Sequence, residues 1–363
     1  MKNIRIVICI IQFFLISTIS IYSSSFILSN NYKYLFLKQI LWYLFGFVLI
    51  FVIYKQKKGF FYKYNKLMYF ISNVLLILVL IFGSKVNGSS AWFEIPGIGT
   101  FQPSEFMKIF LIITLAVELD KYKNIKKTSK NELLIILRCF IVTLLPAILT
   151  FLEPDTGNVI IYFVIMIVML FMYGIRYRWF IITFMIIGIL IGSFLYLYFF
   201  KEDIFINIFG TDFFYRMDRI FEWKNKEGMQ LENALASIGS SPFYGYGLGK
   251  TPIYIPEVQT DFIITIFICN FGYITSITFF ILLIYFDINL ILIALQQKDK
   301  DKLLLSGIIA MLLFQQVQNI GMNLGIFPIT GITLPFISYG GSSLLCYMII
   351  IGIILNINKK TIK

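Results

Sequence analysis

The sequence predicts an all-α polytopic membrane protein with about ten transmembrane helices and one large extracytoplasmic loop. Of its 363 residues, 59% are hydrophobic and 14% are charged, and the mean hydropathy is +0.84, far above that of soluble globular proteins. Apolar segments of about the length that a hydrocarbon core requires recur along the chain. Lys and Arg concentrate in alternate loops, as expected of a membrane protein with a fixed orientation.

We expect spans near 4–28, 37–54, 67–83, 104–119, 133–151, 157–174, 178–200, 261–286, 303–325 and 337–357. Lys2 and Arg5 precede the first apolar run, but no convincing cleavage site follows near Ser25, so we interpret this segment as an uncleaved signal anchor. No internal repeat is evident. Residues 1–363 are therefore expected to form a single integral membrane domain.

The orientation follows from the basic residues. Most of the 31 Lys and Arg fall in loops that are cytoplasmic if the N-terminus is inside. This places both termini in the cytoplasm and residues 201–260 outside. The net charge of +12 is then explained by topology and by attraction to an anionic inner leaflet, and it does not argue for nucleic acid.

The segment 201–260 is long for a connecting loop and aromatic for a disordered one. We expect short helices near 211–223 and 231–238. The sequence SPFYGYGLGK at 241–250 supplies glycines for tight turns and close backbone approach.

Residue usage restricts the chemistry. The four cysteines lie singly on predicted spans, which favours packing roles over disulfides or metal binding: Cys9, Cys139, Cys269 and Cys346. The chain has no histidine, which excludes catalytic triads that use His and His-ligated zinc. Carboxylates, Lys, Arg, Tyr and Ser remain.

The segment 319–345, NIGMNLGIFPITGITLPFISYGGSSLL, interrupts an apolar region with five glycines and two prolines. Irregular backbone at membrane depth must be buried in protein or line a polar cavity, so we expect this segment to form a cavity wall. A kinked helix end with a tight turn is the alternative. Ser338, Ser342 and Ser343 are expected to satisfy freed backbone groups.

Asp261 lies where the large loop meets the eighth span, within IPEVQTDFI. A carboxylate at the membrane interface usually faces a cavity and marks function. Thr260 or Asp261 fits equally well as a helix N-cap or first-turn acid. Glu257 is either a second ligand or a solvated loop charge.

Glu105 and Lys108 begin the fourth span, after Gln102-Pro103-Ser104. Their spacing favours an internal ion pair, although a buried cation facing a cavity would suit a phosphate. Glu153 and Asp155 occupy a short turn before the sixth span, where Asp155 either caps that helix or binds a divalent cation.

Arg216 and Arg219 lie one helical turn apart in the large loop. They could clamp a pyrophosphate or pair locally with Asp218 and Glu222. Both interpretations remain open.

Taken together, these segments resemble the SEDS family (shape, elongation, division and sporulation) of membrane glycosyltransferases, which includes RodA, FtsW and SpoVE. The resemblance rests on five ordered blocks: NGSSAWFEIPGIGTFQPSEFMKI, EPDTGNVIIY, YRMDRI with ENALASIGSSPFYGYGLGK, PEVQTDFI, and NIGMNLGIFPITGITLPFISYGGSSLL. It implies a bacterial plasma-membrane peptidoglycan polymerase that uses lipid II and works with a class B penicillin-binding protein.

The resemblance also implies roles for individual residues. Asp261 matches the essential aspartate of the family and would activate the acceptor hydroxyl, as a base or through bound Mg²⁺ or Mn²⁺. Lys108, Arg216 and Arg219 would be anion ligands, and Ser342 or Ser343 would line the cavity. Glu105, Glu257 and Thr260 are further candidates for substrate binding, and Asp155 is a second candidate metal ligand.

Short tails and the approach Ile320-Gly321-Met322-Asn323 favour a RodA-type elongation protein over an FtsW-type division protein. Two departures from the family pattern are Cys269-Asn270 in place of an acidic pair, and Ser89-Ser90-Ala91 without a basic residue. Two other functions remain open. They are a lipid II flippase or transporter, and a scaffold that activates a penicillin-binding protein without catalysis.

Overall fold

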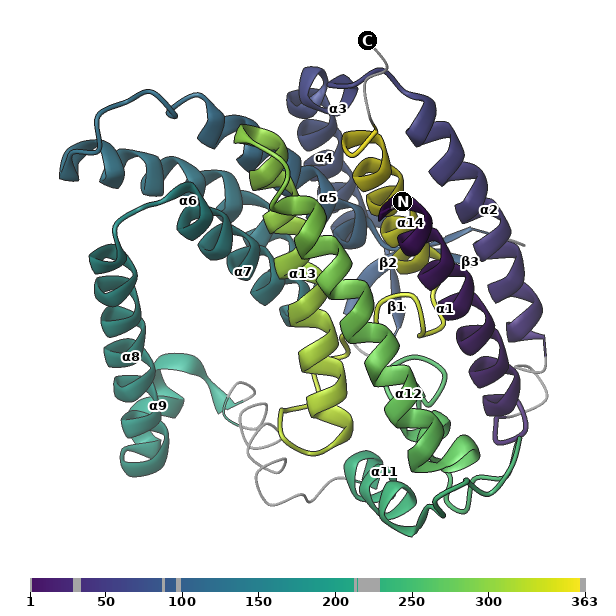
Figure 1. Cartoon of the computed structure of the whole chain (residues 1–363). Helices are drawn as coiled ribbons and strands as arrows, with labels where there is room; N and C mark the ends of the chain where they lie inside the picture. The colour runs from purple at the N-terminus through teal and green to yellow at the C-terminus, as the bar shows by residue number, and fades with distance from the viewer. Residues whose placement is uncertain are drawn as a thin grey trace.

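The computed structural model describes residues 2–28, 34–86, 89–95, 99–211, 214 and 229–359, and it shows a bundle of long helices (Figure 1). The long helices of the bundle are α1 (Lys2–Ser24), α2 (Leu35–Lys55), α4 (Asn65–Phe82), α5 (Pro103–Asp120), α6 (Ser129–Leu152), α7 (Thr156–Tyr173), α8 (Tyr177–Phe200), α12 (Ile263–Ala294), α13 (Asp299–Asn323) and α14 (Gly341–Ile357). Shorter helices are α3 (Phe60–Lys63), α9 (Glu202–Phe209) and α11 (Met229–Ser240). These long helices correspond in order to the ten predicted spans.

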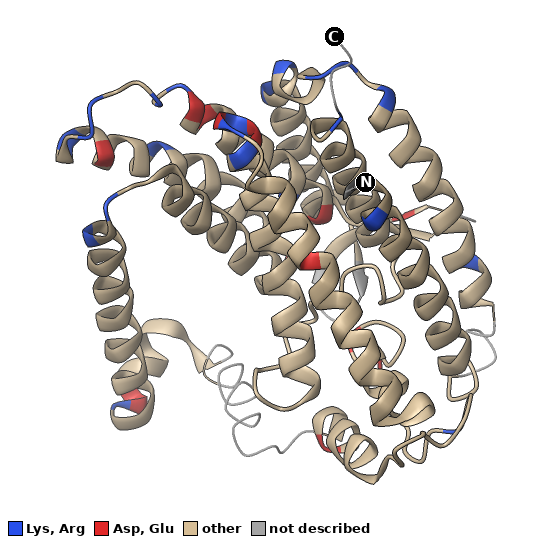
Figure 2. Cartoon of the chain, in the orientation of Figure 1, with Lys and Arg blue, Asp and Glu red and all other residues tan. Residues whose placement is uncertain are grey.

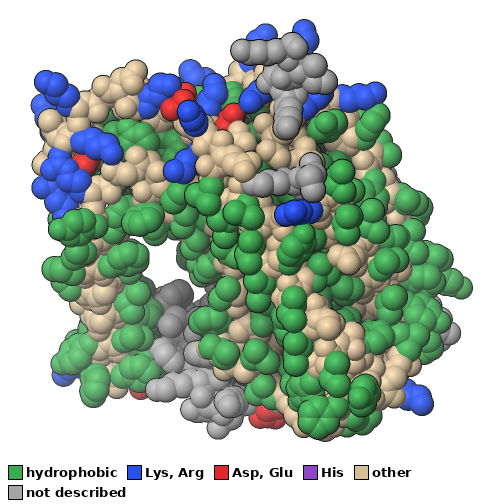
Figure 3. Space-filling model, in the orientation of Figure 1, with side chains coloured by type: hydrophobic (Ala, Val, Ile, Leu, Met, Phe, Trp, Pro, Cys, Tyr) green, Lys and Arg blue, Asp and Glu red, His purple; other side chains and the backbone are tan. Residues whose placement is uncertain are grey.

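Eight of the described helices are long and apolar enough to cross a membrane by length and composition. Helix α14 is apolar but has 17 residues. Helix α5 carries four ionisable residues, Glu105, Lys108, Glu118 and Asp120. The chain is a multi-pass membrane protein. Apolar side chains cover the side of the molecule between its two ends (Figure 3).

Both described ends of the chain lie at one end of the bundle, which we call the terminus end. Asn358, just after α14, donates a hydrogen bond from Nδ2 to Oδ1 of Asn3 at 2.6 Å. Most of the described Lys and Arg residues also gather there (Figure 2). The opposite end, which we call the loop end, carries the segments 83–86, 89–95, 99–102, 153–155, 241–262 and 324–340.

The all-α prediction overlooked one small element, a three-stranded antiparallel sheet at the loop end. It consists of β1 (Ser84–Val86), β2 (Ser89–Ile95) and β3 (Gly99–Phe101), in the order β1-β2-β3. Phe93 pairs with Phe101 and Ile95 with Gly99. The strands between the third and fourth predicted spans thus hydrogen-bond their backbones as hairpins, directly before α5.

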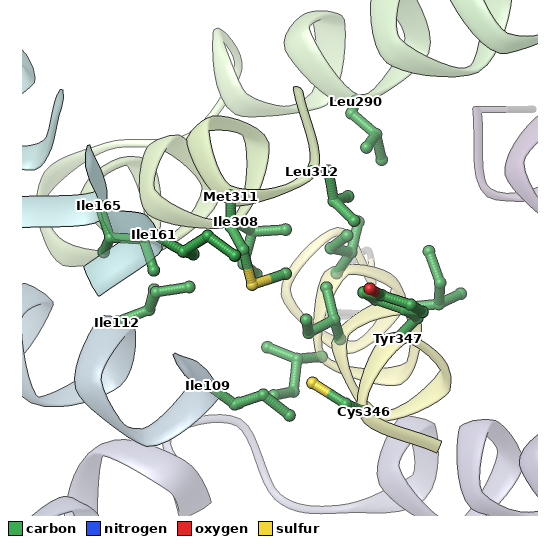
Figure 4. Packing of buried hydrophobic residues seen from close by; sticks show 14 of the residues in the cluster. Ile109, Ile112, Ile161, Ile165, Leu290, Ile308, Met311, Leu312, Cys346 and Tyr347 are labelled. Carbon is green, nitrogen blue, oxygen red and sulfur yellow. The ribbon is translucent and has the colours of Figure 1, made fainter. Parts of the chain in front are cut away.

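A contiguous apolar core joins α5, α7, α12, α13 and α14 (Figure 4). Ile109 and Ile112 of α5 and Ile308, Met311 and Leu312 of α13 are almost completely buried. The cysteines are buried free thiols within the described chain, which confirms their packing role: Cys9, Cys139, Cys269 and Cys346.

Helix α8 stands apart from this core (Figure 1), and among its residues only Tyr198 is buried. Its start is tied to α6, because Nε of Arg176 lies 3.1 Å from Oε1 of the buried Glu132 and Nε1 of Trp179 donates to Oε2 of Glu132 at 3.0 Å. Its end packs on α9, where the rings of Tyr198 and Phe205 lie 5.5 Å apart.

Several predicted span boundaries differ from the helix ends by four residues or more, and the eighth and tenth spans are examples. The eighth span was expected at 261–286, but α12 continues to Ala294 through a break at Gly272, where φ is +74°. The tenth was expected from 337, whereas α14 begins at Gly341. The predicted helix 231–238 is confirmed as part of α11. The predicted helix 211–223, with Arg216 and Arg219, lies almost entirely outside the described residues.

Candidate functional site

The broken segment predicted from the glycines and prolines is non-helical from Leu324 to Gly340, between α13 and α14. Ser338 of this segment and Ser342 in the first turn of α14 do bond to main-chain groups, as predicted. Ser338 Oγ donates to the carbonyl of Thr260 at 2.6 Å and accepts from the N–H of Leu334 at 2.9 Å. Ser342 Oγ donates to Thr100 O at 3.0 Å and accepts from Gln102 N at 3.1 Å. The broken segment and the start of α14 together therefore join the turn before α12 to the residues before α5.

The two later serines also bond to the backbone, as predicted. Ser342 cross-links α14 to β3 and is half-buried, and Ser343 is buried and donates to Gly340 O at 3.3 Å. Their role as cavity liners stays a prediction.

Asp261 lies in the turn before α12, and its carboxylate does not cap that helix. Helix α12 begins at Ile263 with Phe262 as N-cap, and no side-chain cap hydrogen bond is made. The capping interpretation of Thr260 and Asp261 is therefore wrong. The Asp261 side chain is half-buried, next to Gly331 of the broken segment, where an added Cβ would lie 3.9 Å from Asp261 Oδ2.

The main chain of Asp261 is held from two sides. Its N–H donates to Glu257 O at 3.0 Å. Its carbonyl accepts from Nδ2 of Asn319 at 3.0 Å and from Nδ2 of Asn323 at 2.9 Å. The sequence reasoning did not single out these two asparagines, although two amides four residues apart at the end of an apolar span were a visible signal.

Burial, and then the negative charge of Glu257, raise the pKa of the Asp261 carboxyl to about 7, against an opposing contribution from the Thr260 hydroxyl. A carboxyl with a pKa near the working pH exchanges protons readily, which is the property a general base needs. Glu257 itself is exposed and adopts a left-handed φ of +51°. The half-buried Thr260 donates from Oγ1 to Glu257 O at 3.1 Å.

A second polar cluster occupies the loop end of α5, α6 and α7. Lys108 is completely buried, and its Nζ lies 2.8 Å from Oε1 of Glu105. Asn158 of α7 also donates to Glu105 Oε1, at 3.3 Å. The structure matches the ion-pair interpretation of these residues. With no exposed surface, Lys108 would meet an anion only after a rearrangement.

Asp155 is the N-cap of α7, accepting from Asn158 N on Oδ1 at 3.1 Å. Its Oδ2 accepts from Gln102, Ser104 and Asn158 at 2.8–3.0 Å. The capping interpretation is confirmed. These donors satisfy the carboxylate without a metal ion, so Asp155 does not fit the predicted metal site.

Glu153, in the same turn, is completely buried. Burial, and then the charge of Asp155, raise its pKa to about 8. The two clusters adjoin through the broken segment, since a Cβ at Gly157 would lie 3.0 Å from Thr330 O and from Ile332 Cγ1.

The pair Cys269-Asn270, one of the departures from the family pattern, supports the segment 241–250, which we call the glycine-rich loop. Asn270 donates to Ile266 O at 2.8 Å, and its Oδ1 accepts from Lys250 N at 3.1 Å. Tyr246 N donates to Cys269 O at 2.8 Å. An Asp at position 270 would lose the donor to Ile266, so this chain uses the position to hold its loop.

A groove of about 510 Å³ lies away from both clusters, between α7, α12 and α13, and includes Val168, Ile291, Ala310 and Phe314. Apart from Lys302 and Ser306 its walls are apolar, and they suit hydrocarbon. Within the described residues, no group of three or more His, Cys, Asp or Glu is arranged to hold a metal ion.

Comparison with known proteins decides the family. The profile of the FtsW, RodA and SpoVE family, described as cell cycle proteins, matches residues 3–363. The chain belongs to this family. The resemblance predicted from the five sequence blocks is thereby confirmed.

Two curated relatives illustrate how fully this SEDS chain is covered. The "Probable peptidoglycan glycosyltransferase FtsW" of Wigglesworthia glossinidia brevipalpis is 33% identical over 359 residues, covering 95% of this chain and 89% of its own. Stage V sporulation protein E of Bacillus subtilis is 32% identical over 391 residues, covering 98% and 97%.

Solved structures confirm the fold. Thermus thermophilus rod shape determining protein RodA aligns with a TM-score of 0.70 at 24% identity, covering 99% of this chain and 97% of its own. A chain from a peptidoglycan synthase complex, studied for the coordination of polymerization and crosslinking, aligns with a TM-score of 0.80 at 23% identity, covering 97% and 96%. The SEDS chain therefore has the all-α polytopic fold, with its small sheet.

Proposed function

We propose that this SEDS protein is a peptidoglycan glycosyltransferase that polymerises glycan strands from lipid II, with Asp261 as its central carboxylate. The observation that supports this proposal most is the Asp261 turn. The carboxylate caps no helix, is partly open, has a pKa raised to about 7, and belongs to a backbone fixed by two amides. The name of the FtsW relatives supports the same reaction class.

In the reaction, the acceptor sugar hydroxyl attacks the anomeric carbon of the donor, and the lipid pyrophosphate leaves. Asp261 would accept the hydroxyl proton on its carboxylate as the new C–O bond forms. Its position at the end of a membrane helix suits a donor whose head group is polar and whose polyprenyl tail stays in lipid. Arg216 and Arg219, outside the described residues, remain proposed ligands of the pyrophosphate.

The residues around Asp261 fit a divalent cation only in the way that Mg²⁺ usually binds, through one or two carboxylates, water and substrate phosphates. Asp261 would be the ligand, with the exposed Glu257, whose charge acts on Asp261, as a second carboxylate. Such an ion would supply Lewis-acid stabilisation of the leaving pyrophosphate.

The proposed orientation places the terminus end in the cytoplasm and the loop end, with Asp261 and the segment 201–260, outside. The gathering of Lys and Arg at the terminus end supports it, because basic loops stay inside (Figure 2). A cysteine introduced at Tyr244, which is 81% exposed, should then react with a membrane-impermeant thiol reagent in intact cells. A cysteine at Lys57 should react only after permeabilisation.

The proposed partner is a class B penicillin-binding protein in the plasma membrane. The likeness to a chain of a peptidoglycan synthase complex supports this pairing. The elongation role predicted from the short tails stays a prediction. The names of the curated relatives, FtsW and stage V sporulation protein E, favour division or sporulation.

The test is glycan synthesis from labelled lipid II by the protein with its penicillin-binding partner and Mg²⁺. Asp261→Asn should abolish polymer, whereas Asp299→Asn, at an exposed carboxylate of the terminus end, should leave it unchanged. If the Asp261→Asn protein still makes polymer, Asp261 is not the general base. If a folded wild-type complex makes no polymer, the flippase and the scaffold are the functions that remain.

A further inference from the structure

Asn319 and Asn323 of α13 converge on one atom, the main-chain oxygen of Asp261. Both asparagines are completely buried. Asn319 Nδ2 lies 3.0 Å from that oxygen and Asn323 Nδ2 lies 2.9 Å from it. Each amide also makes a second bond, from Asn319 to Ile332 O at 2.8 Å and from Asn323 to Asn319 O at 2.9 Å. All four N–H donors of the pair are therefore used.

The Asp261 carbonyl depends on these donors because α12 does not use it. The N–H of Thr265 bonds to Phe262 O at 3.1 Å, so the helix ladder begins one residue later. A buried carbonyl without a hydrogen-bond partner costs free energy of folding, and the cost is larger where no water molecule can replace the missing donor. The two amides thus decide which way the peptide plane after Asp261 faces.

The same amides connect this turn to its surroundings. Asn323 Oδ1 accepts from Thr265 Oγ1 in the first turn of α12 at 2.8 Å. The bond from Asn319 to Ile332 O holds the broken segment next to the Asp261 turn, where a Cβ added at Gly331 would lie 3.9 Å from Asp261 Oδ2. One pair of side chains therefore places the helix start, the aspartate and the facing wall relative to one another.

We propose that Asn319 and Asn323 are positioning residues, an amide clamp that aims the Asp261 carboxylate at the acceptor hydroxyl. This inference rests on the proposed function, because it assigns Asp261 a reacting partner. The asparagines act through Asp261 and do not touch substrate, since neither is exposed and every amide hydrogen is engaged. Misplacing a reacting group by about 1 Å costs on the order of a hundredfold in rate.

The kinetic experiment compares Asn319→Leu and Asn323→Leu, which keep approximate volume and remove the donors, with Asn356→Leu as a matched control. Asn356 is a buried amide of α14 that donates to the carbonyls of Ile53, Tyr54 and Gln56 at the terminus end. In the complex with labelled lipid II, each clamp variant should lose about a hundredfold in kcat with KM nearly unchanged. The control should keep its kcat whatever its thermal stability.

Two further measurements separate positioning from general destabilisation. The acid limb of the pH profile should move in the clamp variants, because the environment of Asp261 changes with its orientation, and stay fixed in Asn356→Leu. Asn323→Gln, which keeps an amide one methylene further out, should recover part of the lost kcat. If the Leu variants do not fold, Asn323→Gln and Asn323→Ser replace them in the comparison with the wild type and with Asn356→Leu.

Hydrogen–deuterium exchange of the peptide spanning 257–262 tests the clamp without any reaction. Exchange should rise in the Asn319 and Asn323 variants and not in the Asn356 control. Unchanged exchange, or a clamp variant with wild-type kcat, would overturn the inference. If the wild-type complex makes no polymer, the proposed function fails, and the exchange result alone then decides whether the clamp exists.

Discussion

Replacing Lys108 by Met should destabilise the protein strongly, because it leaves Glu105 charged and buried. The Lys108 side chain is 0% exposed and that of Glu105 8%, with 2.8 Å between Nζ and Oε1. Removing one partner of such a pair costs about 3–5 kcal/mol, whereas replacing both by neutral groups is often close to neutral. The double variant Glu105→Gln/Lys108→Met should therefore recover most of the stability that Lys108→Met loses.

The control is a more exposed pair at the end of the same helix, where Lys123 follows α5 and also lies 3.7 Å from Asp299. Lys123 and Asp120 lie 3.9 Å apart with side chains 47% and 25% exposed, so Lys123→Gln should cost less than about 1 kcal/mol. Thermal unfolding can be followed with a thiol-reactive fluorophore, because all four native cysteines are buried and become reactive on unfolding.

The result also separates the two interpretations of Lys108. A stable double variant that still polymerises lipid II would show that Lys108 serves only as a counter-ion to Glu105. A stable double variant that has lost activity would restore its role as an anion ligand. The buried-pair reasoning is refuted if Lys108→Met alone costs less than about 1 kcal/mol, or if the double variant is as unstable as the single one.

Three further predictions concern other parts of the molecule. Polymerisation should rise as pH increases through about 7, because the Asp261 pKa is about 7 and the ionised form is the base. Since that folded pKa is above the ordinary value, the folded protein binds the proton more tightly than the unfolded chain, and stability should fall from about pH 4 to pH 7. Asp261→Asn should consequently unfold at a higher temperature than wild type at pH 8, and an equal midpoint would contradict the raised pKa. Gly245→Ala should displace the glycine-rich loop from Asn270 and make it more sensitive to limited proteolysis, since φ is +78° and a Cβ would lie 2.3 Å from Asn270 O. Gly239→Ala is the control, because its Cβ meets open space, and it should leave the proteolysis pattern unchanged. Glu132→Gln should loosen the start of α8 by weakening its contacts with Arg176 and Arg178, which increased hydrogen–deuterium exchange at 175–180 would reveal and unchanged exchange would exclude.

The helical frame could be predicted because lipid imposes it. Spans of apolar residues appear as helices in the expected order, since a backbone in hydrocarbon must bond to itself. Where water or protein replaces lipid, this constraint ends. The strands around Phe93 and Phe101 depend on pairing within one short segment, and the break at Gly272 depends on contact with Phe243 and Gly245. Hydropathy records neither of these.

The candidate site, too, could be predicted from the sequence only in part. Asp261 was identifiable because a carboxylate at a membrane boundary is costly, and the serines of the broken segment were recognised as partners for freed backbone groups. The amide clamp was not predicted, because Asn319 and Asn323 acquire meaning only from the Asp261 carbonyl, 58 and 62 residues away in sequence. The roles of Lys108 and Asp155 needed the distances to Glu105 and to the donors from α5 and α7.

The length of helix α8 makes its tilt in the membrane depend on the thickness of the bilayer. Its 24 residues extend about 36 Å, longer than a hydrocarbon core of about 30 Å, and hardly any of its side chains are fixed by the bundle. Such a helix accommodates the mismatch by tilting. Because its far end packs on α9, at the start of the large loop, a thinner or thicker membrane would change the angle at which that loop leaves the bilayer. The lipid composition chosen for reconstitution therefore belongs among the controlled conditions of any activity measurement.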